Sequence, residues 1–359
     1  MPLRMMTDLQ PEEQLLFACL REEQTDQQAE EIVNQFRDEP LVWEVILNIA
    51  WSQGVAPLIY TNLKQCAGMG LQVPDEILDL LHRCRLASEK EYQRRQLLLK
   101  EALLTIHANG NEVMLLKGIA HDTVVHSDPV ATQSADIDLM TKARREEFPK
   151  EQLKLIYRFN RQEPFEINFG QHHDLDISQT LSVDYDVIWS DAREIELFGS
   201  KFHVMCPEDM LIFACTNSGR KRFFHLKAIY AIVELLRFYP DMDWKRLATK
   251  VKQYQCHNQV YAALLATSMT TQHPLPENVR TLLGVGTLRA RLIKHLVRRM
   301  SYSSLAERTL LLSGGAAVTF LTDKEKWNRS GLLPFATYDS RQLIKRTSTL
   351  IKQARNRQH

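Results

Sequence analysis

The sequence is poor in the residues that mark specialised folds. Only six of its 359 residues are cysteine, with no CxxC pair and no short spacing to histidine, so we expect reduced, mostly buried thiols rather than a zinc site or a disulfide framework. Thirteen glycines and thirteen prolines are too few for a collagen-like or low-complexity chain. Because 44% of the residues are hydrophobic, the chain can bury a core, and disorder as its main state is excluded.

Long apolar runs are also missing. The longest nearly uncharged apolar stretch, 309–322, contains two adjacent glycines and is shorter than the roughly 18 residues that a membrane-spanning helix needs. It predicts a buried helix and a turn instead. Residues 1–10 carry no apolar signal-peptide core, and from these two observations we expect a cytoplasmic protein.

The chain has almost no net charge, since 45 Lys and Arg oppose 44 Asp and Glu. A uniformly basic nucleic-acid binder is therefore excluded. The charges are unevenly distributed along the chain. Residues 1–40 are acidic, with ten acids and three arginines, whereas residues 341–359 are basic, with six Lys or Arg and no acid. A second basic segment, 289–299, has an apolar side. These basic segments favour either a solvated surface or contact with RNA or an acidic protein.

Hydrophobic periodicity divides the chain into four parts and predicts an α+β fold, with a small mixed sheet between two helical regions. The expected boundaries are 1–110 for an N-terminal helical region, 111–205 for an α/β core, 206–340 for a C-terminal helical region and 341–359 for the tail. Helical spacing predicts helices that include 43–50, 74–87, 88–109, 207–214, 225–239, 244–254, 259–267 and 288–300. Alternating or β-rich stretches predict strands at 113–116, 134–140, 152–159, 163–169 and 202–205.

Asp136 and Asp138 are the first candidates for chemistry. On a strand, residues two apart point to the same side, so both carboxylates leave one face while Ile137 and Leu139 enter the core. Two neighbouring carboxylates repel each other unless a cation lies between them, and Mg²⁺ prefers carboxylate and phosphate oxygens. The alternative is a solvated strand face that binds nothing.

Two neighbouring segments favour the metal site over the solvated face. Lys117 and Gly118 end one predicted strand and begin a helix, where glycine allows phosphate oxygens to approach backbone N–H groups. Glu166 lies on a later predicted strand and would supply a third carboxylate if that strand pairs beside the first. Asp174 and Asp176 form a second acid pair, after His172 and His173, and are the other candidates for that third carboxylate.

Three segments together resemble a family. The residues 115–118 (LLKG), 135–140 (ADIDLM) and 165–168 (FEIN) resemble the uncharacterised bacterial nucleotidyltransferase family of the DNA polymerase β-like superfamily. Residues 43–58 and 205–211 are similar to the same family, and the resemblance covers roughly residues 10–250.

The resemblance implies a nucleotidyltransferase core that uses Mg²⁺ or Mn²⁺ to move a nucleoside monophosphate from a nucleoside triphosphate to an acceptor. Asp136, Asp138 and Glu166 would bind the metal, and Glu166 would also help to deprotonate the acceptor. Lys117 and Gly118 would contact the phosphates. The acceptor could be a small molecule, a peptide or a nucleic-acid end.

The chain departs from the family pattern at three points. Thr132 stands where the family usually has Arg, Asn168 stands in place of His, and the segment between Asp138 and Glu166 is shorter than the family leads us to expect. A catalytically silent protein that keeps the fold for binding is therefore one alternative, and an RNA-binding or RNA-modifying protein is another.

A cluster of cations, Arg220, Lys221 and Arg222, precedes the predicted helix 225–239. Cations at this place suit a triphosphate. A solvated start of a helix is the other interpretation.

Overall fold

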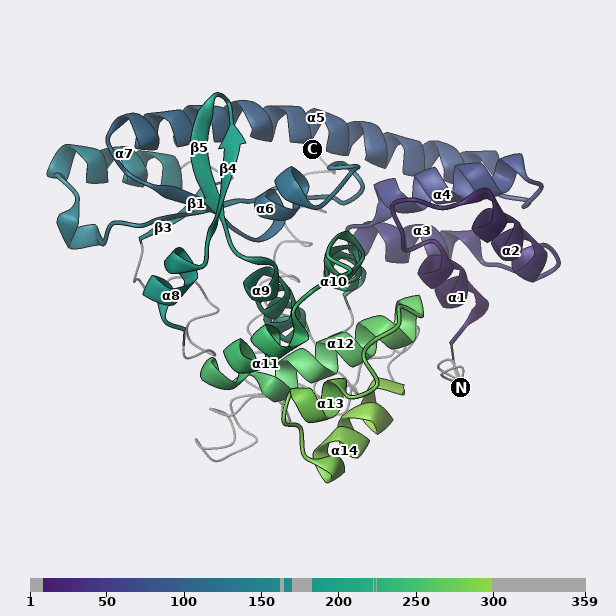
Figure 1. The fold of residues 1–359 in the computed structure, drawn as a ribbon. Helices are drawn as coiled ribbons and strands as arrows, with labels where there is room; N and C mark the ends of the chain where they lie inside the picture. Colours follow the sequence, from purple (N-terminus) through teal and green to yellow (C-terminus); the bar gives the residue numbers. More distant parts are fainter. Residues whose placement is uncertain (1–8, 162–164, 170–182, 222, 224, 299–359) are drawn as a thin grey trace, which may run out of the picture.

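The computed structural model describes residues 9–161, 165–169, 183–221, 223 and 225–298. Within these residues there are fourteen α-helices and one five-stranded mixed sheet, which lies at one side of the molecule in Figure 1. The predicted α+β class is confirmed.

The N-terminal part is helical. Its helices are α1 (Pro11–Ala18), α2 (Asp26–Phe36), α3 (Trp43–Ser52), α4 (Ala56–Gly68) and α5 (Asp75–Ala108). Helix α5 replaces the two helices predicted over 74–109, and the break expected between Ala87 and Ser88 is wrong, because no Gly or Pro lies between 75 and 108 to end a helix. Helix α5 packs against α3, α4 and β1, and Figure 1 shows it running from the N-terminal helices to the sheet.

The sheet brings four chain segments to one edge. Its strands are β1 (Val113–Leu115), β2 (Ile137–Thr141), β3 (Phe165–Phe169), β4 (Arg193–Leu197) and β5 (Ser200–Val204), in the spatial order β3-β2-β1-β5-β4. Strand β1 is antiparallel to β2 and parallel to β5, while β2 is parallel to β3. The ends of β1 and β5 therefore lie at the same edge as the beginnings of β2 and β3. The strands predicted at 113–116, 163–169 and 202–205 are confirmed within a residue or two.

One predicted strand is a helix. Residues 152–159 belong to α7 (Lys150–Asn160), whose buried Ile156 and Phe159 are three apart, a helical spacing rather than a strand alternation. Parallel strands need a crossover connection, and α7, after the short 3₁₀ helix η1 (Arg145–Glu147), is the crossover from β2 to β3. The short segment between Asp138 and Glu166 therefore holds a complete connection.

Two other connections between strands contain short helices. Helix α6 (Lys117–Val124) follows β1, and α8 (Tyr185–Ser190) precedes β4. Within the described residues 183–197, α8 and β4 are the regular elements.

The C-terminal part of the described chain, after β5, is helical. They are α9 (Pro207–Arg220), α10 (Leu226–Phe238), α11 (Trp244–Gln253), α12 (His257–Thr271), α13 (Val279–Leu282) and α14 (Thr287–Arg298). Helix α9 begins as the sequence predicts, with Pro207 in its first turn followed by two acids that favour the positive end of the helix dipole. Helix α12 is buried almost all round and contacts α9, α10, α11 and α14.

The buried apolar residues of the described chain form one continuous core, from Leu15 in α1 to Val297 in α14. Five of the six cysteines are buried, and all six are free thiols. No helix among the described residues is long and apolar enough to cross a membrane. The predictions for 309–322 and for the tail 341–359 lie outside the described residues.

Candidate active site

Two carboxylates lie directly opposite each other at the edge of the sheet described above. Asp138 of β2 is paired in register with Glu166 of β3, so both side chains leave the same face of the sheet. Asp138 is buried, whereas the Glu166 side chain is 48% exposed. One acid is therefore anchored in the protein and the other reaches solvent.

The side chain of Lys117, just after the neighbouring strand β1, contacts both acids. It follows β1, begins α6 and has a positive φ of 48°, a left-handed conformation that is uncommon outside glycine. Its ammonium Nζ donates to Asp138 Oδ1 at 2.7 Å and to Glu166 Oε2 at 3.4 Å. A cation thus bridges the two acids.

Burial dominates the electrostatics of this group. Burial raises the pKa of Asp138 to about 7, with Lys117 opposing the rise and Glu166 adding to it. Burial also works against the charge on Lys117, but attraction to Asp138 and Glu166 exceeds it, so the pKa of Lys117 is raised. The lysine is therefore charged when it lies between the two acids.

Asp136 is placed differently from the prediction. The strand expected over 134–140 begins only at Ile137, so Asp136 lies one residue before β2, where it is exposed. Its backbone lies at the same sheet edge as Asp138, but its carboxylate is not gathered with Asp138 and Glu166 into one tight three-ligand group among the described residues.

Gly118, the residue after Lys117, allows the segment before Asp136 to come close. A Cβ atom at Gly118 would lie 3.2 Å from Ser134 Oγ, closer than an ordinary van der Waals contact. Glycine therefore favours the close approach between the start of α6 and the segment that leads into β2, because a larger residue would push the Ser134 side chain aside.

A cavity opens beside Lys117 and Gly118, between α6, α9 and α10. Its walls are mainly apolar and include Leu115, Met210 and Phe213, and its polar lining includes Lys117, Lys221, Lys227, His121 and Asn217. The cavity lies beyond the ends of β1 and β5, so it shares the sheet edge with the carboxylates. It combines an apolar interior with several cations.

Burial lowers the pKa values of two polar residues that line the cavity, Lys227 and His121. Burial lowers the pKa of Lys227 to about 8, against the opposing pull of Asp122 and Asp136, and its Nζ donates to the Gln133 carbonyl at 2.7 Å. Burial, together with the nearby His126 and Lys227, lowers the pKa of His121 to about 3. The His121 imidazole is therefore neutral at physiological pH.

The cation cluster predicted around Lys221 is described in part. The backbone of Arg220 ends α9, and Lys221 follows it, exposed and lining the cavity. Arg222 lies outside the described residues, as do the alternative acids Asp174 and Asp176 and the histidines before them.

The carboxylate pair fits a divalent cation. The Lys117 ammonium is a stand-in ion, since it shows that the position between Asp138 and Glu166 accepts positive charge. The donors are carboxylate oxygens, which Mg²⁺ and Mn²⁺ prefer. Asp136 is exposed at the same sheet edge and is a candidate for a further oxygen.

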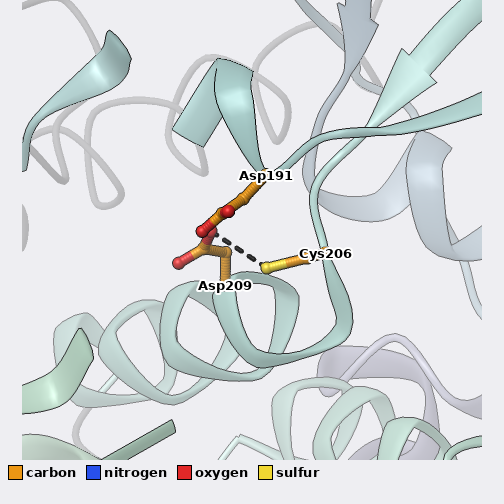
Figure 2. A group of neighbouring side chains, drawn as sticks. All are labelled: Asp191, Cys206 and Asp209. Carbon is orange, nitrogen blue, oxygen red and sulfur yellow. Dashed lines mark hydrogen bonds between the residues drawn. The ribbon is translucent and has the colours of Figure 1, made fainter. Parts of the chain in front are cut away.

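A second acid cluster lies at the end of α8 and the start of α9, and it was not predicted from the sequence. Figure 2 shows Asp191, Cys206 and Asp209 converging from the end of α8, the residue before α9 and the first turn of α9. Their ligand atoms lie within 4.8 Å of one another, a spacing at which a metal ion could be held. The Cys206 thiol donates to Asp209 Oδ2 at 3.2 Å.

This second cluster already contains a cation. The Lys250 ammonium of α11 lies 2.6 Å from Asp191 Oδ2 and 2.8 Å from Asp209 Oδ2, and Tyr254 donates to Asp209 Oδ1 at 3.0 Å. Burial and the neighbouring Asp209 raise the pKa of Cys206 to about 12, which keeps its sulfur protonated. A metal ion would have to displace both the ammonium and the thiol proton, so we interpret the cluster as a brace between α8, α9 and α11.

Lys227 belongs with the cations that the sequence indicates around the start of the helix predicted over 225–239. It is a cation inside the otherwise apolar beginning of α10, a place where an unpaired charge is costly. The cluster around Lys250 gave no such signal, because its members come from α8, α9 and α11, segments that lie far apart in the chain.

The mixed sheet is consistent with a nucleotidyltransferase-type protein, and so are the acids at its edge and the adjoining Lys117–Gly118 turn. The chain belongs to a family described as uncharacterised nucleotidyltransferases, whose family model matches residues 39–271. No curated protein and no solved structure matches the chain.

Proposed function

We propose that the protein is a divalent-metal-dependent nucleotidyltransferase that moves a nucleoside monophosphate from a nucleoside triphosphate to an acceptor hydroxyl or phosphate. The observation that carries the proposal is the pairing of Asp138 with Glu166 beside the Lys117–Gly118 turn. Membership of a nucleotidyltransferase family supports the same class of reaction.

Asp136, Asp138 and Glu166 are the residues that we assign to Mg²⁺ or Mn²⁺. When bound, the ion supplies positive charge that polarises the phosphate and favours the ionised form of the acceptor oxygen. Asp138 holds its position because β2 is buried, whereas Glu166 is free to turn toward an acceptor that arrives from solvent.

The phosphates are assigned to the start of α6. The first-turn N–H groups of a helix have no partner within the helix, so the N–H of Gly118 suits a phosphate oxygen. Lys117 and Lys221 add positive charge on the same side, and the sequence places Arg220 and Arg222 next to Lys221. The apolar cavity beside them is the place that we assign to the nucleoside.

The proposed transfer exchanges one bond at the α-phosphorus for another and needs no oxidant or reductant. An acceptor oxygen attacks the α-phosphorus, the bond from that phosphorus to the bridging oxygen breaks, and pyrophosphate leaves with the electron pair. For a hydroxyl acceptor, the Glu166 carboxylate takes the proton.

The experiment incubates the full chain with each of the four ribonucleoside triphosphates, labelled at the α-phosphate, and with Mg²⁺ or Mn²⁺. Pyrophosphate release and the mass added to the protein or to a supplied acceptor are measured. We expect release with wild type and none with Asp136→Asn combined with Asp138→Asn, while circular dichroism of the double variant stays native.

The matched control is Glu194→Gln with Glu196→Gln, because these two acids have the same spacing on β4 and are exposed. This pair of substitutions should leave nucleotide binding unchanged. If the Asp136 and Asp138 double variant binds a nucleoside triphosphate as tightly as wild type, the site assignment is wrong.

A second candidate function is a catalytically silent protein that binds a nucleotide or a protein partner through the same fold. The observation in its favour is that the Lys117 ammonium already places a positive charge between Asp138 and Glu166. Thr132 and Asn168, where the family pattern has Arg and His, point the same way. Pyrophosphate release with any acceptor would contradict it.

Among the described residues, an RNA-binding function is favoured by the basic surface of α14, where Arg289, Arg291 and Arg298 are exposed. Phosphate contacts make affinity for RNA fall steeply with salt. An RNA interaction that is weak and insensitive to salt would contradict this candidate.

A further inference from the structure

Lys117 occupies an unusual position for a residue next to a phosphate-binding turn. Its backbone begins α6, but its side chain crosses to β2 and β3, where the ammonium lies 2.7 Å from Asp138 Oδ1 and 3.4 Å from Glu166 Oε2. The side chain is 22% exposed. It is therefore a monovalent cation in the place where the proposed reaction needs a divalent one.

A lysine ammonium and a divalent ion cannot both fill this position. The ammonium occupies the space in which Asp138 and Glu166 oxygens would have to approach Mg²⁺ or Mn²⁺, which binds oxygen at roughly 2.0–2.2 Å. Two positive charges a few ångströms apart also repel each other, and more strongly beside a buried carboxylate than in water. Metal binding therefore requires the ammonium to leave.

We propose that Lys117 and the divalent ion exchange places during substrate binding. In the metal-free protein the ammonium holds Asp138 and Glu166 together. When the ion arrives with a nucleotide, the ammonium moves to the phosphate side of the turn. The nucleotide half of this exchange rests on the proposed function, whereas the competition between Lys117 and the metal does not.

The surroundings of Lys117 permit such a movement. Lys117 also lines the cavity, and its side chain has a flexible four-carbon stem, so the ammonium has a second direction open to it. That side holds Lys221 and Lys227, so a third ammonium placed there adds to the local positive charge. A nucleotide phosphate would offset that charge.

The exchange makes metal and nucleotide binding mutually dependent. Without nucleotide, the metal must compete with Lys117 for the two acids, so its affinity is low. With nucleotide, Lys117 gains a new partner and the competition ends. By linkage, the metal increases the affinity for nucleotide by the same factor as nucleotide increases the affinity for the metal.

The test titrates Mn²⁺ into the full chain without nucleotide and measures the free ion by electron paramagnetic resonance. Lys117→Met keeps most of the length of the side chain and removes its charge, so we expect Mn²⁺ to bind about fivefold tighter or more than to wild type. Lys117→Arg keeps the charge and should behave like wild type. Adding Asp138→Asn to Lys117→Met should abolish the gain.

Lys142→Met is the matched control, because Lys142 is an exposed lysine paired with Glu112 at the opposite end of β2. It removes the same net charge from the protein and should leave Mn²⁺ affinity unchanged. A similar gain in Lys142→Met would attribute the effect to net charge and overturn the proposal. Unchanged or weaker Mn²⁺ binding by Lys117→Met would overturn it as well.

Thermal unfolding supplies a second readout, because removing the ammonium leaves two carboxylates facing each other. Metal-free Lys117→Met should melt below wild type, and saturating Mn²⁺ should raise its Tm by more than it raises that of wild type. Equal Mn²⁺-induced shifts would contradict the exchange. A protein that shows the Mn²⁺ effects but binds no nucleoside triphosphate contradicts the proposed function and leaves the competition intact.

Discussion

Asp138 and Glu166 face each other across two parallel strands, although a helical connection separates them in the sequence. Their register depends on helix α7, which carries the chain from the far end of β2 back to the start of β3. Because the side-chain period of a strand is two, a shift of one residue in this register would point Glu166 away from Asp138. The geometry of the acid pair is therefore a property of the whole crossover unit.

Glu166→Gln tests the assignment of the third carboxylate. The amide keeps the size of the side chain but cannot take a proton or offer a charged metal ligand. Under the proposed function we expect kcat to fall by about 10²-fold or more. Since Glu166 is half-exposed, the free energy of unfolding should change by no more than about 0.5 kcal/mol. Pyrophosphate release and urea unfolding measure the two effects.

The control for this prediction is Asp174→Asn combined with Asp176→Asn, the other acid pair that the sequence offers. That double variant should keep its activity within about threefold of wild type, well under the loss expected for a proton-transfer group. The reverse result would be an inactive double variant of Asp174 and Asp176 together with an active Glu166→Gln. It would assign the third carboxylate to Asp174 or Asp176 instead of Glu166.

Gly118→Ala tests the close approach at the start of α6. The new methyl group meets Ser134 Oγ at 3.2 Å, so we expect the segment before Asp136 to shift and nucleotide affinity to fall severalfold. Alanine favours the helical conformation over glycine by up to about 1 kcal/mol, so stability should not fall with affinity. Isothermal titration with a nucleoside triphosphate and Mg²⁺ measures the affinity.

Ser134→Ala provides the matched partner for that experiment, because it removes the hydroxyl that the new methyl group meets. The double variant Gly118→Ala with Ser134→Ala should bind nucleotide nearly as well as Ser134→Ala alone. If the double variant stays as weak as Gly118→Ala, the contact with Ser134 is not the cause.

The local pattern was sufficient to predict the strands that carry the site. Continuous or alternating apolar residues indicate β1, β3 and the part of β2 from Ile137 onward. The structure also pairs β2 with β3, as the assignment of Glu166 as third acid requires. The assignment of 152–159 to a strand is wrong because its apolar residues fit both periods, and only packing against β3 selects the helix.

Contacts between distant side chains were not predictable in the same way. No spacing rule shows that Lys117 turns toward Asp138 and Glu166 rather than toward a phosphate, since a lysine stem reaches either. The brace around Lys250 joins three helices, and its pairs form only after those helices have packed. Such contacts follow from tertiary structure and not from propensity or periodicity.

Lys250→Met tests that brace. Both Lys250 and Asp209 are buried, so removing the ammonium leaves a buried carboxylate without its charge partner. Loss of one member of a buried ion pair costs about 3–5 kcal/mol, and the partly exposed partner Asp191 should hold the effect to the lower end. Urea unfolding should show this loss for Lys250→Met and almost none for Lys245→Met, an exposed lysine on the same helix. Equal stability of the two variants would contradict the brace.

Glu22, between α1 and α2, forms hydrogen bonds that connect the N-terminal helices to α10 and to the segment after α6. Tyr230 of α10 donates to Glu22 Oε1 at 2.6 Å, and the N–H and hydroxyl of Ser127 donate to Oε2, both at 3.0 Å. The His126 imidazole Nδ1 lies 3.2 Å from Oε1. Burial alone would raise the pKa of Glu22, but His126, Tyr230 and Ser127 together lower it from 4.5 to about 2.

This lowered pKa predicts how stability depends on pH. Between the ordinary pKa of 4.5 and the folded value of about 2, the unfolded chain binds a proton at Glu22 that the folded protein does not. The contribution of Glu22 is therefore complete above that window and is lost as the pH falls through it. Urea unfolding of wild type and Glu22→Gln should show the largest difference at about pH 6 and a progressively smaller one below about pH 4, because the other carboxylates titrate equally in both proteins. A difference that stays constant with pH would mean that Glu22 acts through its shape and hydrogen bonds and not through its charge.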